Sequence, residues 1–521
     1  MNLLHRIPLL VPAIAFAMGI LLKSWTTLSD SIVLAFASVL LMAWWLRLMR
    51  TRGVFRGFLF PWSLLTVGMF LLGCLWFRPA ELTQKHRPSW SEKQYTEVAG
   101  ILEKPLNLSA KGRTGQIITY ARRKEGDAWR GVVERMKFFT RDTVLSLEVG
   151  DTVFVKAKPK LLETESTSYQ AYLDKQGLRY ILFSKTIKQG GIGTSWRIRL
   201  GRMQKRLSKH WDNYCEKEEI AGLAKAMFLG NKTGLNRETK DRFAIAGFSH
   251  LLAISGLHVG ILFVLLSSLT KPMQGWQWGR WLGTILLLGA LVSFSLLTGA
   301  SPSVVRASNM LGVYLLVRLV HQRIHPMNVL AFCGLLQLIW APEDLLTVGF
   351  QLSYLAVGVL LWLLPKYAAW VKTPFPLLNR LFDLIGVNLL ATAATAPLVW
   401  YYFGTFPTYF LPANLVVAPV IFVLVFSGFL SVILSLVSPV LAGYTAWICE
   451  KGLMALDFVA RETVQWPFSR LDGWAGQEIG WGILALELGT ALLLILTPKI
   501  FMVLRTHYSK NGIKKRSLMS K

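Results

Sequence analysis

The sequence predicts a polytopic α-helical membrane protein of about 12 spans, with a small β-barrel domain inserted outside the cytoplasm. Hydrophobic residues make up 53% of the 521 positions and the mean hydropathy is +0.43, which is too apolar for a soluble protein of this length. These residues occur in runs of about 17 to 25, the length that crosses a bilayer as a helix. One long polar stretch, residues 78–245, interrupts the runs and predicts a separate domain.

The N-terminal region, residues 1–77, is expected to hold three spans, near 7–22, 31–46 and 58–77. The first run resembles a signal peptide, but the next span follows within ten residues, which favours an uncleaved helix. Four arginines between the second and third spans mark that connection as cytoplasmic by the positive-inside rule (Arg47, Arg50, Arg52 and Arg56). The third span therefore exits on the outer side.

The polar stretch begins with an expected β domain, residues 78–195. Segments enriched in β-branched or aromatic residues predict strands at 95–102, 116–122, 130–140 and 151–157. Five short strands in this length suit an OB-fold-like barrel, a common platform for single-stranded nucleic acid, although such barrels also bind many other ligands or none. The residues expected to contact an anionic strand are Lys156, Lys158, Lys160, Arg122 and Arg123.

The positive charge of this stretch is unusual for a region outside the cytoplasm. The whole chain carries +28, and residues 78–245 hold 33 Lys and Arg against 19 Asp and Glu. Positive-inside bias cannot explain that surplus. Two interpretations remain: the domain binds an anionic ligand, or it has an ordinary basic surface. Residues 196–245 are expected to be a basic helical connector along the membrane surface.

A second membrane region, residues 246–500, is expected to form a helical bundle followed by a basic cytoplasmic tail, 501–521. Charges in the connections alternate from side to side, which places both termini inside. The expected spans lie near 249–268, 281–298, 304–320, 327–341, 346–364, 384–402, 411–436, 438–459 and 478–498.

Polar and ionisable groups recur inside these apolar runs, where burial without a partner is costly. His258 and Arg306 are the strongest functional candidates, because Ser, Thr, Asn and Gln also serve simply to join helices. Gly256 and Gly260 form a small-xxx-small surface for close helix approach. The residues expected to line or gate a wet passage are Ser249, His250, Ser255, Gly256, His258, Gly260, Pro302, Arg306, Asn309, Gln351, Ser353, Asn388, Thr392 and Thr395.

The sequence offers no basis for an enzyme. It has no phosphate-binding G-x-x-x-x-G-K-[ST] loop, no H-E-x-x-H or CxxC cluster and no G-x-S-x-G turn. Its four cysteines lie far apart, without metal-ligand spacing or a disulfide pattern. We therefore expect no catalytic residues, no metal and no cofactor.

The run His250-Leu-Leu-Ala-Ile-Ser-Gly-Leu-His-Val-Gly260 closely resembles the hallmark of the ComEC family of competence proteins. Leu229-Gly-Asn-Lys-Thr-Gly-Leu235, Thr298-Gly-Ala-Ser-Pro-Ser-Val-Val-Arg306 and Gly349-Phe-Gln-Leu-Ser-Tyr354 resemble further blocks of that family, as do Ala394-Thr-Ala-Pro397 and Tyr169-Gln-Ala-Tyr-Leu-Asp-Lys-Gln-Gly177. The resemblance covers nearly the whole chain. This sequence lacks the histidine cluster of the metallo-β-lactamase-like domain that many members carry, so it resembles a short form.

The resemblance implies a channel that admits single-stranded DNA across the cytoplasmic, or inner, membrane during natural transformation. It also implies an extracytoplasmic DNA receptor or pilus, a cytoplasmic helicase-like ATPase and a separate nuclease as partners. The alternative from another class is a secondary transporter of a small anion or lipid, with a structural outer domain; inverted repeats would favour it. A third is a non-transporting assembly scaffold whose basic surface contacts lipid.

Overall fold

The computed structural model describes the protein over residues 7–25, 59–76, 96–109, 112–124, 128–140, 150–162, 173, 178–192, 196–232, 234–275, 278–320, 324–467 and 469–472. Three expected features lie outside these residues: the span near 31–46, the span near 478–498 and the tail 501–521.

The first and third expected spans form a helical pair, α2 (Leu10–Trp25) and α4 (Leu59–Trp76). The two backbones lie in direct contact, because a Cβ on Gly19 would collide with the Phe70 carbonyl and one on Gly73 with the Phe16 carbonyl. This is the small-residue packing by which membrane helices associate. Fully buried Phe16 attaches the pair to the rest of the protein through a cluster that includes Phe350.

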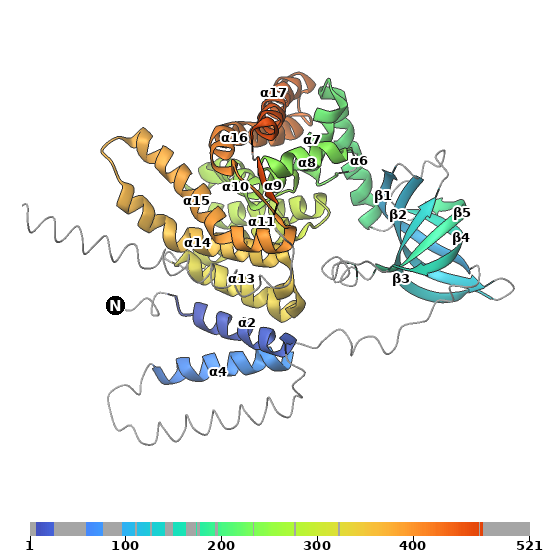
Figure 1. The fold of residues 1–521 in the computed structure, drawn as a ribbon, viewed down its shortest axis with the longest axis horizontal. Helices are drawn as coiled ribbons and strands as arrows, with labels where there is room; N and C mark the ends of the chain where they lie inside the picture. Colours follow the sequence, from blue (N-terminus) through green and yellow to red (C-terminus); the bar gives the residue numbers. More distant parts are fainter. Residues whose placement is uncertain are drawn as a thin grey trace, which may run out of the picture.

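Five strands in the polar stretch form a closed barrel in the order β1-β2-β3-β5-β4 (Figure 1). Strands β3 and β5 run parallel, and the other neighbours are antiparallel. The strands are β1 (Thr96–Ser109), β2 (Gly112–Lys124), β3 (Arg130–Thr140), β4 (Asp151–Leu161) and β5 (Leu178–Ile192).

Strict alternation along β4 separates the interior of the barrel from its outer surface. Val153, Val155 and Ala157 are fully buried in a core shared with Phe138 and Leu182. The intervening side chains point outward, as the period of two in a strand requires, and they include the three lysines at 156, 158 and 160. All three lysines that were expected to contact an anionic strand therefore lie on the outer face of the barrel.

Three helices follow the barrel: α6 (Trp196–Tyr214), α7 (Glu218–Leu229) and α8 (Arg237–Ile245). Figure 1 shows α6 running from the barrel to the helical bundle. The expectation that the whole segment 196–245 lies on the membrane surface is wrong for α7, in which nine of 12 residues are buried. Its run of Leu, Ala, Met and Phe packs on the bundle, whereas α6 keeps an exposed basic face with Lys205, Arg206 and Lys209.

The bundle comprises α9 (Ser249–Leu252), α10 (Gly256–Thr270), α11 (Gly279–Leu297), α12 (Pro302–Val320), α13 (Pro326–Trp340), α14 (Val348–Val371), α15 (Pro376–Phe403), α16 (Phe410–Leu434) and α17 (Pro439–Gln465). Six helices within the described residues are long and apolar enough to cross a membrane: α10, α11, α12, α14, α15 and α16. Helices α2, α4 and α13 contain shorter apolar stretches. Helix α17, expected as a span, is not among the six, and its second half carries charged side chains.

The bundle core contains a chain of aromatic rings that joins α6 and α7 to the membrane helices. Trp211 stacks on Phe228, with ring centroids 4.9 Å apart. Phe429 of α16 then meets Phe228 and Phe294 edge-on at 5.4 and 5.3 Å. The neighbouring Gly428 leaves room for the ring of Phe228, which would collide with any Cβ at that position. On the chain that follows α15, a short strand, β6 (Thr405–Pro407), pairs with β7 (Arg470–Asp472) beyond α17.

Candidate functional site

The motif at residues 247–260 forms a helix break and not the continuous span expected from 249 to 268. The short helix α9 ends at Leu252, Ala253 and Ser255 adopt extended backbone angles, and α10 begins at Gly256. His258 explains the break, because its Nδ1 accepts a hydrogen bond from the Ser255 backbone N–H at 3.3 Å and lies 3.0 Å from Ser255 Oγ. A reciprocal contact of this kind caps a helix start.

The environment of His258 fixes its proton. The ring is fully buried, and Nδ1 accepts from a backbone donor, so the hydrogen of the neutral imidazole lies on Nε2. That Nε2 is buried and has no hydrogen-bond partner within the described part of the chain. The second histidine differs: His250 is exposed, as is Ser249, and its Nδ1 lies 3.1 Å from the Gly247 carbonyl oxygen.

Helix α12 lies against the start of α10. A Cβ on Gly256 would come within 3.6 Å of the Ala307 side chain, which is ordinary van der Waals contact. The equivalent position on Gly260 has no neighbouring atom within 4 Å among the described residues. Of the two glycines, Gly256 alone has a neighbouring helix in contact among the described residues. The contact is with Ala307, which follows Arg306 in α12.

Arg306 is buried, with 4% of its surface exposed, and its NH2 group lies 3.3 Å from Ser303 Oγ one turn earlier. Pro302 begins the helix, after a turn in which Ala300 has a φ of 51°, a conformation that side chains rarely adopt. A Cβ on Gly349 at the start of α14 would lie 3.4 Å from the same NH2 group. Asn309, expected with Arg306 to line a passage, is exposed, and its role stays a prediction.

The polar residues of α14 and α15 mostly form hydrogen bonds within their own helix or with an adjacent element. Gln351 donates to the Leu345 carbonyl at 3.0 Å and accepts from the Tyr402 hydroxyl at 3.1 Å, which links the two helices. Asn388 and Thr395 donate to carbonyls of their own helix at 2.9 and 2.8 Å. Ser353 and Thr392 are half-buried. The role of Asn388, Thr392 and Thr395 in lining a passage therefore stays a prediction.

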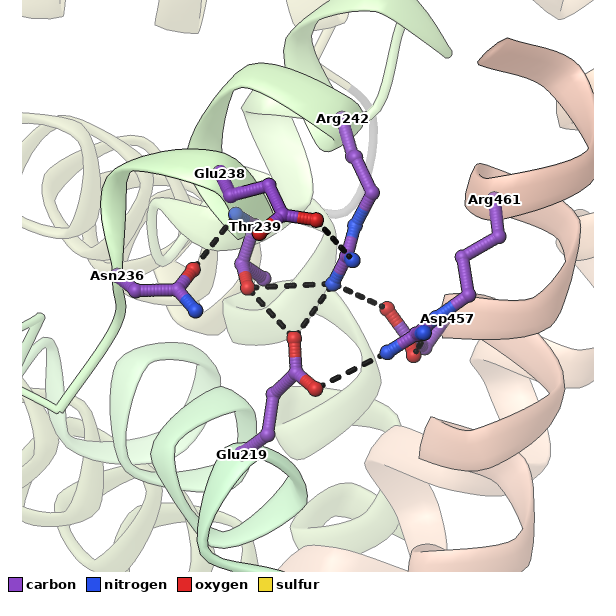
Figure 2. Close-up of polar contacts among 7 residues, drawn as sticks. All are labelled: Glu219, Asn236, Glu238, Thr239, Arg242, Asp457 and Arg461. Carbon is purple, nitrogen blue, oxygen red and sulfur yellow. Dashed lines mark hydrogen bonds and ion pairs between the residues drawn. The ribbon is translucent and has the colours of Figure 1, made fainter. Parts of the chain in front are cut away.

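Sequence reasoning missed a cluster of ionic side chains that joins α7, α8 and α17 (Figure 2). Arg242 pairs with Glu219 and lies 3.4 Å from Asp457, while Arg461 lies 2.8 Å from Asp457 and 3.0 Å from Glu219. The two arginines and two carboxylates form a closed ring of alternating charge. Thr239 donates to Glu219 at 2.7 Å. The available signal was the pair Asp457 and Arg461, four residues apart on one helix face.

This ring sets the ionisation of Glu219. Burial alone would raise the pKa of its carboxyl, but hydrogen bonds from Thr239 and Arg242, with the charges of Arg242 and Arg461, outweigh burial and lower the pKa below its ordinary value. Hydrogen bonding to Asp457 is the main cause that raises the pKa of Arg461. Both shifts favour the charged forms of Glu219 and Arg461.

The barrel carries an aromatic and basic patch that was also missed. The guanidinium of Arg123 lies over the ring of Trp129 at 5.0 Å, and Trp129 meets Phe154 edge-on at 6.1 Å. Both aromatic residues are exposed. Arg123 also pairs with Glu97 at 2.7 Å. Of the other basic residues expected here, Lys158 and Lys160 are exposed, whereas Lys156 and Arg122 are half-buried.

Comparison with known proteins decides the family. The family model described as "Competence protein" matches residues 227–499, slightly more than half of the chain. The chain belongs to the ComEC family of competence proteins. Because this family match accompanies the six apolar helices, the chain is a multi-pass protein of the inner membrane.

Individual relatives align with between about two fifths and half of the chain. ComE operon protein 3 of Bacillus subtilis is 31% identical over 251 residues, which are 48% of this chain and 31% of that protein. Recombination protein 2 of Haemophilus influenzae is 27% identical over 212 residues, 39% of this chain and 27% of that protein. The chain thus spans about a third of the length of these curated relatives. No solved structure matches it.

Proposed function

We propose that this chain forms an inner-membrane passage for single-stranded DNA during natural transformation. The observation that carries the proposal is the helix break at 253–255, with buried His258 on one side and the Arg306 helix against it. Irregular backbone at membrane depth is tolerated only where protein covers it or water lines it. Ionisable groups kept at that depth mark a transport path by default. Membership in a family of competence proteins supports DNA as the substrate.

The barrel would serve as the extracytoplasmic DNA-binding domain. We propose that it is an OB-fold, since its five-stranded order and closed form suit that class. Backbone phosphates would meet the exposed Lys158 and Lys160, and bases would stack on Trp129 and Phe154. The exposed aromatic rings beside the basic residues favour a nucleic-acid ligand over the alternative of an ordinary basic surface.

The activity proposed is transport and not catalysis, with no cofactor. Movement of a strand then needs work from another protein, for which a cytoplasmic helicase-like ATPase is proposed. An extracytoplasmic receptor or pilus would deliver DNA, and a separate nuclease would remove the second strand.

The test is a clean deletion of the gene, complemented with wild type or with His258→Ala at matched membrane abundance. We expect transformation to fall in the deletion strain and to return only with wild type. Undiminished transformation in the deletion strain, with no second copy of the gene, would end the DNA reading. The secondary transporter of a small anion would then be favoured, because buried Arg306 suits an anionic substrate as well.

A further inference from the structure

The residues around Arg306 come from two helices that are distant in the sequence. Arg306 lies in the second turn of α12, and Gly349 lies at the second position of α14. Because a Cβ on Gly349 would lie 3.4 Å from Arg306 NH2 and 3.9 Å from NH1, the guanidinium rests against the first turn of α14. Its bond to Ser303 Oγ shows that it also turns back toward the first turn of α12.

Three sources of positive potential therefore meet at one point. The start of each α-helix carries about half a positive charge, together with backbone N–H groups that have no partner inside the helix. The guanidinium adds a full charge in a position where only 4% of Arg306 is exposed. No carboxylate among the described residues forms an ion pair with it, in contrast to Arg242 and Arg461.

Hydrogen-bonding groups at this point also lack partners. Arg306 Nε is buried without an acceptor among the described residues, and the buried Ser301 Oγ, at the residue before Pro302, has no partner there either. The Ser301 carbonyl accepts the first helical bond, from Val305 at 3.0 Å, so its hydroxyl stands at the helix end. Buried polar atoms are usually hydrogen-bonded, so these two atoms are available to bind a polar ligand at this point.

We propose that Arg306, Ser301, Ser303 and the first turns of α12 and α14 form a binding site for a phosphate oxyanion. Helix N-termini bind phosphate through their free N–H groups, and arginine matches its oxygens with paired donors. The site takes one backbone phosphodiester of the transported strand, an assignment that rests on the proposed function. A single charged contact of this kind provides a step at which the strand is held within the membrane.

The test uses the full-length chain in a maltoside detergent, which contains no phosphate, and follows its unfolding temperature. Four additives are compared: inorganic phosphate, the thymidine dinucleotide with its one phosphodiester, its uncharged methylphosphonate analogue, and phosphatidylglycerol. The variant is Arg306→Gln, and the matched control is Arg318→Gln, an exposed arginine at the other end of α12.

We expect inorganic phosphate and the dinucleotide to raise the unfolding temperature of wild type and of Arg318→Gln, while the methylphosphonate has no effect. Arg306→Gln should lose both shifts. Without additive it should be at least as stable as wild type, because it no longer buries an unpaired charge. The dinucleotide should bind Arg306→Gln at least tenfold more weakly, the effect of losing about 1.4 kcal/mol or more.

Two outcomes would overturn the site: no shift of wild type with any phosphate compound, or an Arg306→Gln protein that is less stable yet still responds to phosphate. A shift with phosphatidylglycerol but not with the dinucleotide would overturn the DNA assignment and make a lipid headgroup the occupant. Normal transformation in the deletion strain, with the phosphate shift intact, would remove the proposed function and leave the anion site standing.

Discussion

A guanidinium nitrogen of Arg242 lies 3.4 Å from a carboxylate oxygen of Asp457, although the two residues are 215 positions apart. The contact joins α8, which leads directly into the broken motif, to α17 near the end of the described chain. Glu219 and Arg461 close the ring of charge around it (Figure 2). These ionic contacts position α8, and so the start of α9 and α10, together with the apolar packing of the fully buried Phe243.

Asp457→Asn should destabilise the protein by about 3 kcal/mol, because it leaves Arg242 partly buried without one of its carboxylates. Thermal unfolding of the full-length chain in detergent measures the change. Asp241→Asn is the matched control, since Asp241 forms an exposed pair with Arg237 on the same helix α8 and should have no measurable effect. Equal effects of the two substitutions would show that the ring of charge contributes no more to stability than an exposed ion pair.

Stability should fall as the pH drops below about 4.5, the ordinary value for a glutamate. The folded protein lowers the pKa of Glu219, so the unfolded state binds the proton more readily and stability is lost as pH falls toward the folded pKa. Glu219 faces Thr239 and Arg242 from α8 and Arg461 from α17. Glu219→Gln should flatten the loss, measured as unfolding temperature from pH 7 down to about pH 3, across the range below the ordinary glutamate value. An unchanged slope would assign the loss to other carboxylates.

Sequence patterns predicted the elements well where local chemistry decides them. The apolar run expected at 384–402 lies within α15, and the strand expected at 151–157 is the first part of β4. The break inside the motif was not predicted, because the run from Ser249 onward is apolar enough to read as a continuous helix, whereas the capping contact between Ser255 and His258 starts a new helix. Contacts across the fold, such as Arg242 with Asp457, leave no local pattern. Site chemistry likewise depended on distant pairing, as at Arg306 and Gly349.

His258→Gln separates capping from a role in transport. A glutamine at the third helical position can accept from the N-cap backbone N–H as His258 does, but it lacks the buried imidazole Nε2–H. We expect normal membrane abundance and reduced transformation, whereas His258→Ala should lose the cap as well, at a cost of about 1 kcal/mol. Immunoblots of membranes and transformant counts give the two readouts. Full transformation with glutamine would reduce His258 to a structural cap.

Lys160→Gln should weaken single-stranded DNA binding at every sequence and lower the salt slope of log K by about 0.7, the value for one phosphate contact on a single strand. Lys160 is exposed at the outer end of β4. Fluorescence titrations of the full-length chain at several salt concentrations measure the slope. A slope equal to that of wild type would exclude Lys160 from the phosphate contacts.

Trp129→Ala should weaken binding of single-stranded DNA about tenfold, because one stacking platform is worth about 1–3 kcal/mol per base. The salt slope should stay unchanged, since the substitution removes no charge. Arg123 lies over the same ring, so the ring is held in place and open to a base on its free side.

Trp340→Ala is the control, because Trp340 is highly exposed at the end of α13 and lies outside the barrel. The same titrations give both quantities. Equal loss from the two tryptophan substitutions would mean that aromatic residues act nonspecifically. A reduced salt slope for Trp129→Ala would mean that the ring acts through the position of Arg123 and not by stacking.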